Sequence, residues 1–170
     1  MASLSSAVWV VKRAFLIRGR RRATWQSVAF ASALLGAATG LRSQLGVASV
    51  MVLEEPGLPR VFRHRWNRRL TVAAAAGELV ADKLASTPSR LEPPAFTSRL
   101  VLGALAAALH ARTRNAPWVH AAAIGAGVAA VSARLGHDVR AGFDKHVPDP
   151  VVAVAEDGVA IGLAVAGATR

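Results

Sequence analysis

The chain has 170 residues, of which 53% are hydrophobic and only 18% charged, and its mean hydropathy is positive. This length fits a single domain, and the absence of cysteine excludes disulfides and thiolate metal sites. The 21 Lys and Arg residues against 10 Asp and Glu give a net charge of +11, yet they interrupt apolar runs without interleaved aromatics. This pattern argues against nucleic-acid binding and favours contact with an anionic membrane surface.

The N-terminal stretch is strongly basic. Its six Lys and Arg residues precede residue 24, and the first acidic residue of the chain is Glu54. The basic cluster follows a short apolar stretch, Ala7 to Val11, which is the reverse of a secretory signal peptide. We therefore expect residues 1–24 to form a basic cytoplasmic tail and residues 25–170 a transmembrane helical domain. A mitochondrial presequence, also rich in Arg and free of acids, is the alternative.

Five apolar segments follow, built mostly from Ala, Val, Leu and Gly. Small residues of this kind allow helices to pack closely in lipid, and a span needs about 20 residues. The sequence therefore predicts an all-α, polytopic transmembrane bundle of about five helices with small-residue packing, placed as a multi-pass protein in the inner cell membrane. A soluble helical domain is the alternative. The expected segments are Trp25–Leu53 (interrupted at Gly40–Gln44), Leu70–Ala85, Ser98–Ala111, Pro117–Leu135 and Pro150–Ala168.

The path of the first segment decides the orientation. Five straight spans place slightly more Lys and Arg on the N-terminal side, which predicts a cytoplasmic N-terminus. If the segment bends back at Gly40–Gln44, the basic stretch Arg60–Arg69 joins that side and the charge bias becomes much larger. The sequence leaves both paths open.

Local chemistry predicts several helix ends. Pro93 and Pro94 are expected in a rigid polar connection, with Thr97 or Ser98 as the N-cap of the next helix. Asp149 followed by Pro150 is typical of a helix start. The stretch from 136 to 147 is expected to be a linker.

Ionisable residues inside apolar segments are the main functional candidates, because each charge is costly in hydrocarbon. Glu78 and Asp82 are four residues apart and therefore share one helix face. Two bare carboxylates repel each other there, so a proton or a cation is expected between them. A structural ion pair is the competing interpretation. The predicted proton- or cation-binding candidates are Glu78, Asp82, Glu156 and Asp157, with Arg42 and Lys83 as charged neighbours.

Two glycine pairs lie beside these charges. Gly36 and Gly40 precede Arg42, and Gly158 and Gly162 follow Asp157. A glycine every four residues permits close approach of two helix backbones. We therefore predict helix packing at all four glycines.

The chain shows no nucleophile elbow, phosphate-binding loop, metalloprotease motif or dinucleotide fingerprint. We expect no enzyme activity, no cofactor and no metal. A membrane-embedded enzyme that uses Glu78, Asp82 and the His and Asp residues of the linker is the third alternative. The linker between 136 and 149 contains His and Asp residues of metal-ligand type, but nothing in the sequence fixes their spacing.

Three strings resemble a bacterial family of integral membrane proteins known as domain of unknown function 4126. They are residues 36–43 (GAATGLRS), residues 77–94 with GELVADKL, TPSR and PP, and Pro148–Pro150 with Glu156 and Asp157. The second string is specific, whereas the others are weak alone. The resemblance covers the chain from about Ala29 onward and implies a small multi-spanning helical protein without an assigned activity. The basic tail and the Arg60–Arg69 stretch depart from that family.

Together these features predict a small transporter or channel-like membrane protein whose buried carboxylates bind a proton or a cation. The alternative is a non-catalytic membrane scaffold or accessory subunit in which the same charges pair helices. The expected partners are the lipid bilayer and either further copies of the chain or another membrane protein, with no nucleic acid.

Overall fold

The computed structural model describes residues 23–54, 57–81, 92–143 and 149–170. The predicted tail, apart from its last two residues, and the site candidates Asp82 and Lys83 lie outside these ranges. The described residues form α-helices and no strand, which confirms the all-α prediction. The prediction of about five helices is not confirmed, because the described ranges contain seven. These are α2 (Trp25–Leu41), α3 (Leu45–Leu53), α4 (Arg60–Arg63), α5 (Arg65–Ala81), α6 (Pro93–Thr113), α7 (Trp118–Phe143) and α8 (Asp149–Ala168).

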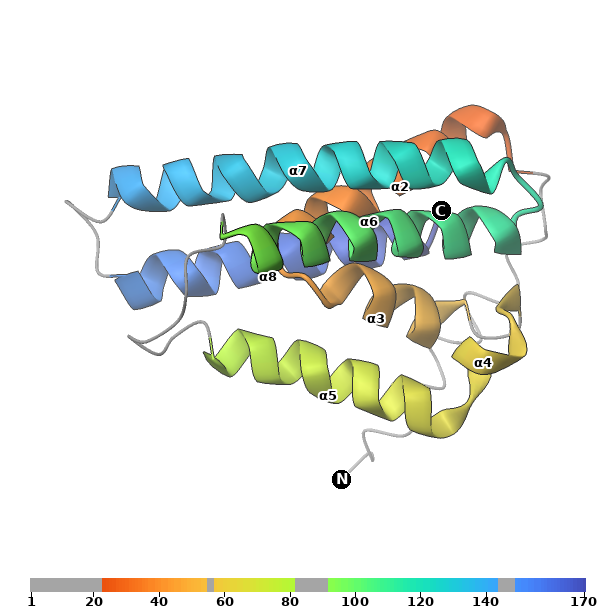
Figure 1. Ribbon diagram of the computed structural model, residues 1–170, viewed down its shortest axis with the longest axis horizontal. Helices are drawn as coiled ribbons and strands as arrows, with labels where there is room; N and C mark the ends of the chain where they lie inside the picture. Colours follow the sequence, from red (N-terminus) through yellow and green to blue (C-terminus); the bar gives the residue numbers. More distant parts are fainter. Residues whose placement is uncertain (1–22, 55–56, 82–91, 144–148) are drawn as a thin grey trace, which may run out of the picture.

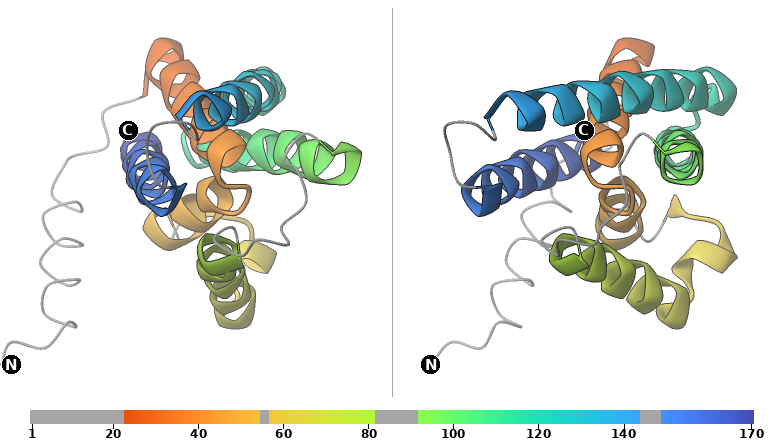
Figure 2. Two further views of the ribbon diagram at one scale, coloured as in Figure 1. Left: turned by 90° about the vertical axis from the view of Figure 1, so that its left-hand side faces the viewer. Right: turned by 60° about the vertical axis from the view of Figure 1, so that its left-hand side comes forward.

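Helix α2 is the centre of the bundle. It packs against α6, α7 and α8, and α6 packs along α7 as an antiparallel neighbour. Helix α5 lies at the edge of the bundle, where it contacts α3 (Figures 1 and 2). The bundle is thus organised around a helix that the sequence places first among the apolar segments.

The first apolar segment is bent into a helical hairpin. Arg42 is extended, with φ −138° and ψ 109°, so α2 ends there and α3 starts three residues later. Helix α3 then folds back beside α2 (Figure 1). A Cβ atom at Gly46 would lie 2.1 Å from the hydroxyl of Thr39, so the hairpin closes tightly only because Gly46 has no side chain. Of the two paths left open by the sequence, the bent one is correct.

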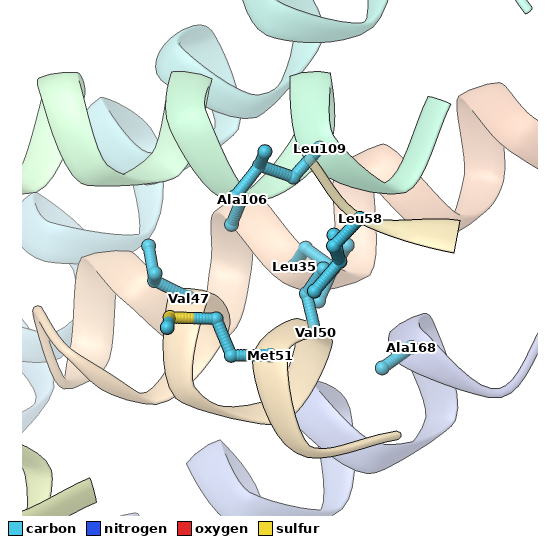
Figure 3. Packing of buried hydrophobic residues seen from close by; sticks show 8 residues of the cluster. All are labelled: Leu35, Val47, Val50, Met51, Leu58, Ala106, Leu109 and Ala168. Carbon is cyan, nitrogen blue, oxygen red and sulfur yellow. The ribbon is translucent and has the colours of Figure 1, made fainter. Parts of the chain in front are cut away.

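The hydrophobic core lies between this hairpin and α6. Leu35 from α2 meets Val50 and Met51 from α3, and Ala106 and Leu109 from α6 cover them (Figure 3). All five side chains are almost completely buried. Burial of a leucine or methionine side chain contributes about 1.5–3 kcal/mol. The core therefore fixes the hairpin against α6.

Close backbone contacts join α2, α6 and α7 at four glycines. A Cβ atom at Gly36 would lie 2.5 Å from the carbonyl oxygen of Gly125, and one at Gly125 would lie 2.4 Å from that of Gly103. Gly40 lies equally close to α7, where its Cβ would meet the carbonyl oxygen of Ala129 at 2.4 Å. The helices approach one another so closely at these positions that only glycine fits there.

The prediction of packing at Gly158 and Gly162 is wrong for the described residues. Both glycines are exposed, and an added Cβ would meet no described atom within 4 Å. Helix α8 instead turns its Ala153, Ala160 and Ala164 toward the bundle. These alanines share a face with Asp157, and successive helix residues are about 100° apart, so packing through Asp157 turns Gly158 outward.

Gly36→Ala should therefore destabilise the protein, while Gly158→Ala should not. The new methyl group at 36 meets backbone atoms of α7, and overpacking of this kind costs about 1–3 kcal/mol. At 158 the methyl group enters open space, and replacing a helical glycine by alanine stabilises by about 0.5–1 kcal/mol. Unfolding of both variants in mixed detergent micelles measures the difference. Equal stability of the two variants would contradict the close crossing.

Two helices are longer than expected. Helix α6 begins at Pro93, with Glu92 as N-cap, so the expected N-cap at Thr97 or Ser98 is wrong. The two prolines fit the first turn of a helix because no backbone N–H is needed there. Helix α7 continues through Gly136 to Phe143, so the linker expected over that stretch is largely helical. The polar residues of this stretch, which predicted a linker, therefore do not prevent helix formation.

Three of the described helices are long and apolar enough to cross a membrane. They are α6, residues Trp118–Arg140 of α7 and residues Val151–Ala168 of α8. Their outward surfaces carry large apolar side chains, including Val101 on α6, Val131 on α7 and Val154 on α8, each close to 60% exposed. An outer surface of this kind is compatible with a membrane protein.

Candidate functional site at the tip of the α2–α3 hairpin

The turn between α2 and α3 leaves backbone groups without helical partners inside the protein. Every helix end exposes N–H or C=O groups that need partners, and this turn consists of only three residues, Arg42, Ser43 and Gln44. Arg42 and Gly40 are buried. Side chains from three other helices converge on the turn and supply the missing partners.

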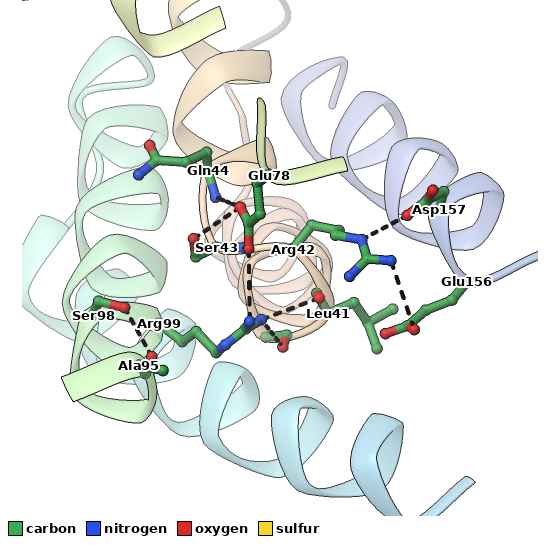
Figure 4. A network of polar contacts seen from close by, with 11 residues as sticks. Leu41, Arg42, Ser43, Gln44, Glu78, Ala95, Ser98, Arg99, Glu156 and Asp157 are labelled. Atoms are coloured by element: carbon green, nitrogen blue, oxygen red, sulfur yellow. Dashed lines mark hydrogen bonds and ion pairs between the residues drawn. The ribbon is translucent and has the colours of Figure 1, made fainter. Parts of the chain in front are cut away.

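Glu78 of α5 caps the start of α3. Its carboxylate accepts hydrogen bonds from the N–H of Ser43 at 2.8 Å, the N–H of Gln44 at 3.0 Å and the Ser43 hydroxyl at 2.9 Å (Figure 4). Gln44, the N-cap residue, makes no capping bond with its own side chain. A negative charge at a helix N-terminus also interacts favourably with the helix dipole. Glu78 is thus a capping group supplied by another helix.

Arg99 of α6 caps the C-terminal end of α2. Its Nη1 donates to the carbonyl oxygens of Gly40 at 2.8 Å and Leu41 at 3.1 Å. A cation is favourable at a helix C-terminus. Its Nη2 also lies 3.6 Å from Oε1 of Glu78, so the two capping charges form an ion pair with each other. Both ends of the broken helix therefore meet a charge of the appropriate sign.

Arg42 connects the turn to α8. Its Nε donates to Oδ1 of Asp157 at 2.6 Å, and its Nη2 lies 3.9 Å from Oε2 of Glu156 (Figure 4). Arg42 is fully buried, and Asp157 is 8% exposed. Charge-assisted bonds of this length are among the strong hydrogen bonds of proteins. The turn is consequently tied to α5, α6 and α8, and we name Arg42, Glu78, Arg99, Glu156 and Asp157 the charged centre.

The charged centre lies well inside the bundle. Asp157 is eight residues after the first residue of α8, or about 12 Å along the helix axis, and Arg99 is about 9 Å from the start of α6. A hydrocarbon core is about 30 Å thick. In a membrane that α6 and α8 cross, these charges lie below the lipid headgroups.

An apolar groove of about 530 Å³ runs beside the charged centre. It is lined by α2, α7 and α8. Glu156 of the charged centre and Arg140 of α7 are the ionisable side chains in its lining. Glu156 therefore faces two environments, the Arg42 guanidinium on one side and the groove on the other.

The structure brings together four of the six predicted site residues, Arg42, Glu78, Glu156 and Asp157. Asp82 and Lys83 lie outside the described residues. Sequence reasoning missed Arg99 and the backbone amides at the turn. Arg99 stands one residue after Ser98, the expected start of a helix, so its charge is expected beside a solvated connection and not inside the bundle.

A second buried polar cluster lies where α3 ends. Nδ1 of His110 lies 2.7 Å from Oε1 of Glu54, and the Thr113 hydroxyl donates to the other carboxylate oxygen. His110 is fully buried, and its Nε2 has no hydrogen-bond partner among the described residues. No spacing or motif in the sequence pairs Glu54 with His110. The cluster ties the end of α3 to α6, as the charged centre ties its start.

Comparison with known proteins finds no matching family model, no similar curated protein and no similar solved structure. The resemblance to domain of unknown function 4126 therefore rests on the sequence strings alone.

Proposed function

We propose that the chain is a multi-pass protein of the inner cell membrane. The three long apolar helices support this placement, and so do the tryptophans. Trp25, Trp66 and Trp118 stand within the first two residues of α2, α5 and α7, all at the same end of the bundle (Figure 1). Each is between 40 and 60% exposed. Tryptophans at one level are typical of the interface between membrane and water.

The end that carries the tryptophans is assigned to the cytoplasm. Because the first segment is a hairpin, the start of α2 lies at the same end as the 60–69 stretch, the last turn of α6 with its connection to α7, and the C-terminus. These parts and residues 1–22, which lead into α2, contain fourteen of the 21 Lys and Arg residues. Cytoplasmic segments are enriched in Lys and Arg. The N-terminus is then cytoplasmic, with a much larger charge bias than five straight spans would give.

The proposed activity is transport or channel-like passage of a small ion, with Glu156 as the proton- or cation-binding group. Buried ion pairs are often no more stabilising than apolar residues of the same size, so a charged centre at membrane depth suggests a role beyond stability. Discontinuous helices with charged ends occur at the substrate sites of secondary transporters. The α2–α3 hairpin shares one feature with them, a helix break at which each helix end meets a charge.

Glu156 is favoured over its neighbours by its contacts. Asp157 is engaged at 2.6 Å by Arg42, and Glu78 accepts three hydrogen bonds. Glu156 lies 3.9 Å from the nearest guanidinium nitrogen of Arg42 and borders the groove. A proton or a cation can therefore approach Glu156 from the groove. This placement is the observation on which the proposal rests.

Glu156→Gln should abolish ion flux without unfolding the protein. The amide keeps the size of the side chain and removes the charge that binds a proton or a cation. Flux is measured with pH- and cation-sensitive dyes inside proteoliposomes containing the purified chain, after a gradient is imposed. Asp138→Asn, an exposed carboxylate on α7, is the matched control and should retain full flux. Unchanged flux in Glu156→Gln, or no flux in the unaltered protein, would reject the proposal.

A non-catalytic scaffold or accessory subunit is the second candidate. It is favoured by the buried pairing of Arg42 with Asp157 and by the use of Glu78 and Arg99 as helix caps. In this case the charges serve to pair helices, and the exposed apolar surfaces serve to bind further copies or another membrane protein. Detergent-extracted protein would then co-purify with a stoichiometric partner or as an oligomer. A monomer that carries flux would contradict this candidate.

A further inference from the structure

Positive charge is concentrated where α4 meets α5. Five arginines stand within residues 60–69, and residues 57–77 contain no Asp or Glu. Three of these arginines are exposed and form no ion pair with a described residue, and we name them the arginine cluster: Arg60, Arg63 and Arg65. A surface of one charge sign, without acidic neighbours, attracts groups of the opposite charge.

Large apolar side chains lie beside the arginine cluster on the outer face of α5. Trp66 and Leu70 are four residues apart and therefore share one helix face. The guanidinium of Arg69 lies over the Trp66 ring, 5.5 Å from its centroid. Val80 stands on the same face, about 21 Å further along the helix axis. Because Trp66, Leu70 and Val80 are each more than half exposed, this face changes from cationic and aromatic at one end to apolar at the other.

The bundle does not cover this face of α5. Helix α5 lies at the edge of the bundle and packs mainly against α3 and α4 (Figures 1 and 2). Its inward side carries the buried Ala75 and Glu78, the residue that caps α3. In a membrane, the outer face would meet lipid headgroups near Trp66 and acyl chains near Val80. The order of charge and apolar surface along α5 matches the order of these layers.

We infer that the arginine cluster binds the phosphate groups of anionic phospholipids in the cytoplasmic leaflet, with Trp66 and Leu70 against the upper part of the acyl chains. Guanidinium groups match phosphate oxygens in geometry and charge, and basic segments beside a membrane are attracted to anionic lipids. A nucleic acid or an acidic protein would match the charge but not the apolar surface that continues to Val80. The inference rests on the proposed membrane placement and not on ion flux.

Fluorescence quenching by labelled lipids tests this site. The chain contains no cysteine, so Leu70→Cys allows one fluorophore to be attached to the outer face of α5. The full chain is reconstituted in vesicles of phosphatidylcholine and phosphatidylglycerol, and a small fraction of one lipid or the other carries a nitroxide near the top of its acyl chain. Quenching should give about fivefold higher affinity for phosphatidylglycerol at position 70, the equivalent of about 1 kcal/mol for one arginine near the surface. At Val154→Cys, an exposed position on α8, the two lipids should quench equally.

Matched triple variants separate a local site from general attraction to the charged protein. Replacing the three residues of the arginine cluster with glutamine should abolish the preference for phosphatidylglycerol at position 70. The control variant removes the same charge from three exposed arginines elsewhere, Arg112, Arg134 and Arg170. The control should keep the preference. Circular dichroism checks that both variants fold, as expected for substitutions at exposed positions.

Salt provides a second measurement that needs no arginine variant. Raising the salt concentration from about 0.05 to 0.5 M shortens the range of electrostatic attraction, so the preference at position 70 should fall several-fold. Equal affinity for the two lipids at position 70, the same preference at position 154, or an equal loss in both triple variants would overturn the site. Quenching at position 154 but not at position 70 would also overturn it, because protein or water would then cover this face. Absence of quenching at both positions would instead reject the membrane placement.

Discussion

Replacing Arg42 with methionine is expected to lower the free energy of unfolding by about 3–5 kcal/mol, the cost of removing one partner from a buried ion pair. Asp157 would then stand almost fully buried without the Nε donor that now lies 2.6 Å from it. Native proteins are stable by only about 5–15 kcal/mol in total. The variant should therefore be close to unfolding at room temperature. Reversible unfolding in mixed micelles, followed by circular dichroism, gives the value.

A second substitution tests whether the pair itself is responsible. In Arg42→Met with Asp157→Leu the buried carboxylate at 157 is removed together with its guanidinium partner, and only Glu156, 3.9 Å from Arg42, still loses a charged neighbour. Buried pairs replaced by apolar residues often retain stability. The double variant should therefore be more stable than Arg42→Met. Arg134→Met provides the matched control, since Arg134 is an exposed residue of α7 and its loss should change stability by less than about 0.5 kcal/mol. A double variant less stable than both single variants would contradict the pairing.

Part of the charged centre is predictable from the sequence for a sound physical reason. A charge within an apolar run is costly, so Arg42, Glu78, Glu156 and Asp157 stand out from the residues around them. Their partners are not predictable in the same way. The structure pairs Arg42 with Asp157, which is 115 residues away in the chain. Spacing along one helix identifies a shared face, but it contains no information about which other helix covers that face.

The choice of face on α8 illustrates the same limit. Gly158 and Gly162 have the spacing of a close crossing, yet the contact of Asp157 with Arg42 turns the neighbouring face inward. Gly36 and Gly40 have the same spacing and do lie at a crossing. A pair of glycines four residues apart therefore allows a close crossing but does not require one. On α8 the contact between Asp157 and Arg42 decides which face of the helix turns toward the bundle.

The hairpin is predictable only as one of two paths. Gly40–Gln44 interrupts the apolar segment, but whether the chain continues or turns back depends on the partners of the freed backbone groups. Those partners are Glu78 and Arg99, which come from helices later in the chain. Arg99 does not stand out in the sequence because a cation beside an expected helix start is usually solvated. Its role follows from the two carbonyl oxygens that it contacts.

Glu78→Ala is expected to open the tip of the hairpin. The substitution removes three hydrogen bonds from the start of α3 and leaves the Arg99 guanidinium without the carboxylate that lies 3.6 Å from it. Hydrogen bonds to charged groups contribute about 1.5–3 kcal/mol. We expect a loss of about 2–4 kcal/mol in unfolding free energy, together with faster hydrogen exchange at the amides of Ser43 and Gln44.

The comparison with Glu78→Gln separates capping from charge. The glutamine oxygen can still accept hydrogen bonds from the turn, whereas the attraction to Arg99 and to the helix dipole is lost. Stability between that of the unaltered protein and that of Glu78→Ala is therefore expected, with slow exchange retained at one of the two amides. If Glu78→Ala left exchange at Ser43 and Gln44 unchanged, Glu78 would not be the cap of α3. The hairpin tip would then have to be held by Arg42 and Arg99 alone, and the carboxylate at 78 would again be a candidate for binding a cation.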